Sequence, residues 1–144
     1  MRKELRGSMV FDASVLIELL LSTKGGVLVR EMLLSGDLFG YTTEIAVVEA
    51  EYVLCRKLGW SEGTRKIKEL MLSGFIQTED ISPLCEQAAK YKCERTIALP
   101  DCFTLALAKT MAIPALFARR KLELAKEIEE SPFDVEVFFL EDFI

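Results

Sequence analysis

Short apolar runs alternate with longer stretches of helical periodicity along this chain. The short runs, typical of buried strands, occupy residues 9–11, 38–42, 75–78, 113–117 and 135–139. The longer stretches, with apolar residues three or four positions apart, occupy residues 14–21, 26–34, 44–58, 61–72, 82–92, 100–111 and 121–130. Gly59 and Gly74 follow two of these helical stretches, with Ser61 available as a cap for one of them, and Pro83 and Pro100 open two others. This alternation predicts an α/β domain with a largely parallel sheet, followed by a tail over residues 140–144.

The chain has the length of one ordinary domain. It contains 144 residues, and a domain of that size buries roughly 70% of the surface that its unfolded form exposes. Residues 1–8 are polar and basic and precede a second methionine, Met9, so we interpret them as an N-terminal extension or a remnant of cloning. Residues 9–144 then form the domain. Asp12 and Glu18 interrupt the apolar stretch that follows, and no run approaches the roughly 18 residues of a membrane span, so we expect a soluble cytoplasmic protein.

Composition restricts the chemistry that this protein can perform. The chain has no histidine, which excludes histidine-based acid–base catalysis, Ser-His and Cys-His triads and most catalytic zinc sites. Its four cysteines form no C-x-x-C pair and are expected to be free thiols. The net charge of −5 argues against a protein that holds nucleic acid mainly by general electrostatic attraction. Any chemistry must therefore use carboxylates, with or without a hard metal ion.

Three acidic residues lie against or within apolar segments, and each has a structural alternative. Asp12 is placed at the end of a strand, where it serves a site or caps the following helix. Glu49 falls on an apolar helical stripe, where a carboxylate is costly unless it binds a cation or pairs with Arg56. Asp101 lies in the first turn of a helix, a position that the helix dipole favours by itself.

Together these carboxylates indicate a metal site. The carboxyl ends of parallel strands meet at one edge of the sheet, where ligands bind, and Asp12 is placed there. Two carboxylates about 4 Å apart repel each other by roughly 4 kcal/mol at an effective dielectric constant of 20, so a cluster requires a cation or a raised pKa. Mg²⁺ or Mn²⁺ fits such oxygen ligands.

The segments around these acids resemble the first three acidic motifs of PIN domains. They are residues 10–16 (VFDASVL), 44–54 (EIAVVEAEYVL) and 99–108 (LPDCFTLALA), in the order and spacing of that family. The resemblance implies a three-layer α/β/α sandwich around a mainly parallel sheet, with a negative pocket for Mg²⁺ or Mn²⁺. It further implies that Asp12, Glu49 and Asp101 are catalytic metal ligands and that Ser14 supports the site by hydrogen bonding. Many small members are VapC-type toxins, which are homodimeric endoribonucleases silenced by an antitoxin.

The chain departs from the family pattern at the fourth acidic motif. The alignment places Ala118 where the family usually has threonine and Arg120 where it has aspartate. Glu123 is the nearest acid that can substitute as a metal ligand, although it can equally pair with Arg119 on a solvated helix. The basic run of Arg119, Arg120 and Lys121 is a candidate to bind the substrate phosphate, or it marks a domain that has lost catalysis.

We therefore expect a Mg²⁺- or Mn²⁺-dependent endoribonuclease, the toxin of a VapBC-type toxin–antitoxin pair, with RNA as substrate, an antitoxin as partner and a homodimeric state. The first alternative is a catalytically degenerate PIN domain that binds RNA or a protein without cutting. The second is an unrelated α/β domain in which the three acids only cap helices.

Overall fold

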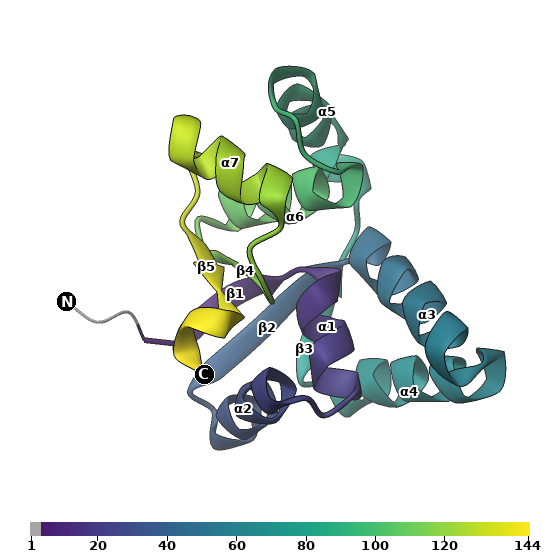
Figure 1. Cartoon of the computed structure of the whole chain (residues 1–144). Helices are drawn as coiled ribbons and strands as arrows, with labels where there is room; N and C mark the ends of the chain where they lie inside the picture. Colours follow the sequence, from purple (N-terminus) through teal and green to yellow (C-terminus); the bar gives the residue numbers. More distant parts are fainter. Residues whose placement is uncertain (1–3) are drawn as a thin grey trace.

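A five-stranded parallel sheet lies at the centre of residues 4–144, the part of the chain that this computed structural model describes (Figure 1). Its strands are β1 (Gly7–Phe11), β2 (Leu38–Thr43), β3 (Ile76–Glu79), β4 (Ala115–Phe117) and β5 (Val137–Phe139), in the order β3-β2-β1-β4-β5. The chain thus builds outward from β1 on one side and then returns to the other side for β4 and β5. The change of direction falls between β1 and β4, the place where parallel α/β sheets form a ligand crevice at their carboxyl edge.

Helices cover both faces of the sheet, so the predicted three-layer sandwich is confirmed (Figure 1). One face carries α1 (Ala13–Leu20), α2 (Lys24–Ser35), α3 (Glu44–Leu58) and α4 (Trp60–Ser73), and the other carries α5 (Cys85–Glu94), α6 (Leu99–Met111) and α7 (Leu122–Glu130). Side chains of β1 alternate between the faces: Met9 and Phe11 join the first core, and Val10 joins the second. No helix within the described residues is long and apolar enough to cross a membrane.

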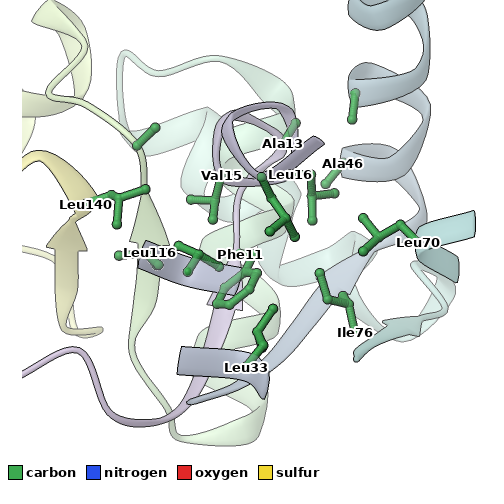
Figure 2. Close-up of a cluster of buried hydrophobic side chains, with 14 of the residues drawn as sticks. Phe11, Ala13, Val15, Leu16, Leu33, Ala46, Leu70, Ile76, Leu116 and Leu140 are labelled. Carbon is green, nitrogen blue, oxygen red and sulfur yellow. The ribbon is translucent and has the colours of Figure 1, made fainter. Parts of the chain in front are cut away.

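Phe11 anchors the first core at the base of the candidate site. Its side chain is fully buried and lies with Val15, Leu16 and Leu116 (Figure 2). A Cβ atom at Gly40 on the neighbouring strand would come within 2.7 Å of the Phe11 ring, so this position leaves no room for a side chain. The Phe11 ring of β1 therefore packs directly on the Gly40 backbone of β2, and a larger residue at position 40 would displace it.

Several element boundaries differ from the sequence prediction for identifiable reasons. Ser61 is not the cap of α4, because Gly59 precedes the helix with a positive φ and no side chain caps it. Pro83 lies within a 3₁₀ turn, Ser82–Leu84, and α5 starts only after it. The predicted tail over residues 140–144 forms a 3₁₀ helix, Leu140–Phe143, whose first residue is buried in the core.

The sheet also begins earlier than the sequence predicts. β1 starts at Gly7, and Ser8 pairs with Phe39 of β2 in the parallel register. Leu5 is buried and belongs to the first core. Residues 4–8 of the expected N-terminal extension therefore pack with the domain, while residues 1–3 lie outside the described residues.

Helices α1 and α2 pack closely at Gly26. A Cβ atom on Gly26 would lie 1.9 Å from the carbonyl oxygen of Glu18, whereas one on Gly25 would meet only the movable side-chain ends of Leu140 and Ile144. Gly26→Ala should lower the free energy of unfolding by about 2–3 kcal/mol, because two backbones must move apart. Gly25→Ala should cost much less, and urea unfolding measures both. Equal losses in the two variants would contradict the packing described here.

Candidate functional site

Asp12 occupies the end of β1 at the change of strand direction. Its side chain is 1% exposed. The Oδ2 atom accepts hydrogen bonds from the Ser14 backbone N–H at 3.0 Å and the Ser14 hydroxyl at 2.7 Å, which caps α1. The Oδ1 atom is buried without a hydrogen-bond partner among the described residues. One oxygen of Asp12 thus caps the helix, and the other has the chemistry of a ligand.

Ser14 joins the ends of the two strands that border the crevice. Its hydroxyl oxygen accepts a hydrogen bond from the Ala118 backbone N–H at 3.0 Å while its proton is donated to Asp12. The Asp12 backbone N–H in turn donates to the Leu116 carbonyl oxygen at 2.9 Å. These bonds hold the Asp12 carboxylate in a fixed orientation relative to β4.

Asp101 reaches the same edge from the opposite face of the sheet. Helix α6 leads into β4, so its first turn lies at the carboxyl edge of the sheet, and Asp101 sits in that turn. The residue as a whole is 2% exposed, and Oδ1 accepts a hydrogen bond from the Lys121 ammonium group at 2.9 Å. Burial raises the pKa of Asp101 and the charge of Asp12 raises it further, while Lys121 opposes both.

Glu49 completes the group from the second turn of α3. Its pKa is raised by burial and then by the charge of Asp12, with Asp101 adding to the increase and Lys121 opposing it. The alternative ion pair with Arg56 is not formed within residues 4–144, where the Arg56 guanidinium lies over the Tyr52 ring, 5.1 Å from its centre. The structure therefore brings the three sequence-predicted carboxylates into one electrostatically coupled cluster, which we call the acidic pocket.

The two arginines that follow β4 are engaged away from the acidic pocket. Arg119 pairs with Glu18 of α1 at 3.6 Å, and not with Glu123. Arg120 makes two hydrogen bonds of 2.6 Å to the Asp142 carboxylate and lies over the Phe139 ring. The residue aligned with the fourth family acid thus packs onto the C-terminal 3₁₀ helix.

Lys121 is the basic residue of this run that faces the acidic pocket. Its pKa is raised: burial opposes the charged form, but the charges of Asp12, Asp101 and Glu49 outweigh that effect. Glu123 is exposed in the first turn of α7, and its charge contributes to raising the pKa of Asp101. Glu123 therefore lies near the rim of the acidic pocket, while an ammonium group lies inside it.

The residues of the acidic pocket fit a hard divalent ion by their chemistry. All the candidate ligands are carboxylate oxygens. The buried Asp12 Oδ1 has no hydrogen-bond partner among the described residues, and a bound cation would compensate for that. As placed in residues 4–144, no three Cys, Asp or Glu side chains group closely enough to hold one ion. The Lys121 ammonium already occupies Oδ1 of Asp101, so the side chains must shift for all three carboxylates to hold one ion.

Sequence reasoning overlooked two supports of the acidic pocket. Thr43 caps α3 by accepting a hydrogen bond from the Ala46 N–H at 3.0 Å, and this orients the helix that carries Glu49. A threonine directly before a helical stretch was a usable signal. The Ala118 backbone contact to Ser14 had no signal in the sequence, because any residue type provides the same N–H group.

Comparisons with known proteins agree with this fold. The PIN domain family matches residues 9–126. No curated protein matches the chain in sequence. Among solved structures, the chain is similar to Mycobacterium tuberculosis VapC20, described as a sarcin-ricin loop cleaving toxin (TM-score 0.65, 17% identity, 82% of this chain and 93% of that one). It is also similar to a chain of a Klebsiella pneumoniae toxin–antitoxin complex (0.65, 20%, 92% and 97%) and of Rickettsia felis VapBC2 bound to promoter DNA (0.68, 13%, 92% and 98%).

The raised carboxyl pKa values predict how stability depends on pH without metal. Between the ordinary and the raised pKa of Asp101 and Glu49, the folded state holds more protons than the unfolded state, so stability falls as pH rises. Asp101→Asn should flatten this decline in urea unfolding with EDTA. Asp134 is the opposite case, because the hydrogen bond from Lys109 lowers its pKa. Its contribution to stability is lost as pH falls, so Asp134→Asn should reduce the loss of stability in acid. An unchanged slope in Asp101→Asn would argue against the coupling.

Proposed function

The chain belongs to the PIN domain family, and on that premise we propose that the protein is a metal-dependent endoribonuclease that cleaves RNA phosphodiesters. The observation that carries this proposal is the buried, unpartnered Oδ1 of Asp12 within a cluster of coupled carboxylates. A carboxylate oxygen in that setting is stabilised by a cation. The similarity to VapC20, described as a sarcin-ricin loop cleaving toxin, supports RNA as the substrate class.

In this proposal Asp12, Glu49 and Asp101 hold a Mg²⁺ or Mn²⁺ ion, with Glu123 at the rim as a further candidate. Such an ion supplies an activated water and neutralises charge on the scissile phosphate. Ser14 keeps the Asp12 carboxylate oriented through its bonds to Oδ2 and to the strand β4 end. The first turns of α6 and α7 add the partial positive charge of helix N-termini at the same edge. Together these features favour an anionic substrate despite the acidic net charge.

A second candidate function is binding of RNA or protein without cleavage. It is favoured by one observation: the position of the fourth family acid is Arg120, which is bound to Asp142. The acidic pocket keeps three carboxylates, a set that suffices for one ion. Cleavage assays separate the two functions directly.

Loss of Asp12 should abolish cleavage. We expect Asp12→Asn to reduce Mn²⁺-dependent cleavage of a structured RNA pool at least about 100-fold, because a metal ligand is removed. EDTA should have the same effect on the wild type. Asp37→Asn is the matched control, since Asp37 is exposed at the opposite edge of the sheet, where it follows α2. A pool that contains the sarcin-ricin loop tests the substrate of the similar toxin. Full activity of Asp12→Asn would disprove the mechanism, and absence of cleavage throughout would favour the binding function.

We further propose that the protein is the toxin of a toxin–antitoxin pair. Several similar chains come from such complexes. An open groove of about 290 Å³ lies between α1, α2 and α4 and is lined by Leu20, Leu33, Leu34, Leu70 and Phe75 among others. Leu34 is 62% exposed. Apolar surface of this kind is typical of a protein-binding site. The homodimer remains a prediction that sedimentation can test.

Charge introduced into this groove should prevent antitoxin binding. Leu34→Glu should weaken co-purification with the product of the adjacent gene at least about tenfold, because a carboxylate would be buried at the interface. RNA cleavage should not change, since α2 does not contribute to the acidic pocket. Leu122→Glu, which alters another exposed leucine outside the groove, is the control. Wild-type protein that fails to bind this product would contradict the pairing, and binding by Leu34→Glu at wild-type strength would exclude the groove.

A further inference from the structure

When all three carboxylates are ionised, the charges of the acidic pocket do not balance without an added cation. Asp12, Glu49 and Asp101 contribute three negative charges when ionised, and Lys121 contributes one positive charge. Two negative charges remain, which is the charge that one divalent ion neutralises. A pair of divalent ions together with Lys121 would leave the pocket strongly positive.

Lys121 is held in the acidic pocket by its place in the fold. It immediately precedes α7, and its Nζ atom lies 2.9 Å from Asp101 Oδ1 and 6.0 Å from the centre of the Phe117 ring. The Asp101 side chain is 3% exposed and that of Lys121 is 43% exposed, so the ammonium contacts a buried acid while remaining open to solvent. An ammonium group has three N–H donors, and Asp101 accepts one of them.

The neighbouring cations are not positioned to replace Lys121. Arg119 pairs with Glu18, and Arg120 binds the Asp142 carboxylate through both terminal nitrogens. The basic run therefore divides into two arginines that tie β4 to other elements and one lysine that faces the carboxylates. The position of Lys121 is specific, and not a general consequence of a basic surface.

We propose that Lys121 serves as the second cation of the acidic pocket, so that its three carboxylates take a single divalent ion while the ammonium remains beside Asp101. The inference rests on the proposed nuclease function, and it gives the pocket the two neighbouring positive charges that two-metal sites obtain from ions about 3.5–4 Å apart. The buried Asp12 Oδ1 marks the ion's place. Asp101 accepts only one of the three N–H donors of Lys121, and the Lys121 side chain is 43% exposed, so the ammonium is available to a phosphate oxygen of the substrate.

Titration with Mn²⁺ in the absence of RNA tests this arrangement. Calorimetry should show one ion per chain for the wild type. Lys121→Met should bind its first ion about tenfold more tightly, because a like charge is removed from beside the ion. Lys121→Arg should stay near the wild type, and Lys126→Met, a charge removal on the exposed face of α7, should have no effect. Two ions per wild-type chain, or unchanged affinity in Lys121→Met, would overturn the proposal.

Thermal unfolding provides a second readout that a purely structural lysine would not produce. In EDTA, Lys121→Met should melt several degrees below the wild type, because the carboxylates lose their internal counter-charge. In saturating Mn²⁺ the difference should disappear or reverse. A loss of melting temperature that is equal with and without Mn²⁺ would assign Lys121 to packing alone and refute the proposal.

The outcomes separate this inference from the nuclease proposal. One bound ion with the expected Lys121→Met effect, but no cleavage of any RNA, would retain the role of Lys121 and reject the nuclease. Metal-dependent cleavage by a wild-type chain that binds two ions would retain the nuclease and reject the role of Lys121. Failure of the wild type to bind Mn²⁺ would reject both.

Discussion

Burial of negative charge at the carboxyl edge of the sheet is the constraint on which the rest of this structure depends. Asp12 and Asp101 are almost inaccessible to solvent, and each belongs to an element that also supports the core. Buried carboxylates are tolerated only when hydrogen bonds or cations compensate them. Here the compensation comes from Ser14, from helix N-termini and from Lys121. The fold therefore holds these charges at a cost in stability that the compensating groups reduce.

The hydrogen bonds through Ser14 couple that charge to the topology. Because β1 and β4 are neighbours at the change of strand direction, the Ala118 N–H lies beside the hydroxyl that orients Asp12. The hydrogen bond from the Ala118 N–H to Ser14 also holds the start of α1 beside the end of β4. A change in strand register would move Asp12 away from Asp101 and Lys121, so the acidic pocket and the sheet must form together.

The elements were predictable where local signals were strong. Helix α3 has the predicted bounds, since Gly59 stops it, and its capping threonine was available in the sequence. The strand β4 is shorter than expected, because the Ile113 N–H still bonds to Ala108 at the end of α6 and Pro114 has no N–H to donate. Acidic motifs around Asp12, Glu49 and Asp101 were visible because each carboxylate interrupts an apolar pattern.

The sequence by itself determined the class of fold, the family and the three acids, because periodicity and buried polar residues leave local marks. Tertiary structure alone decided which basic residue enters the acidic pocket. Arg119, Arg120 and Lys121 are adjacent in the chain and similar in charge, yet Glu18 and Asp142 bind the two arginines, and Lys121 is left to meet Asp101. That choice depends on residues distant in sequence that the parallel sheet brings to one edge, and local patterns do not contain such distances.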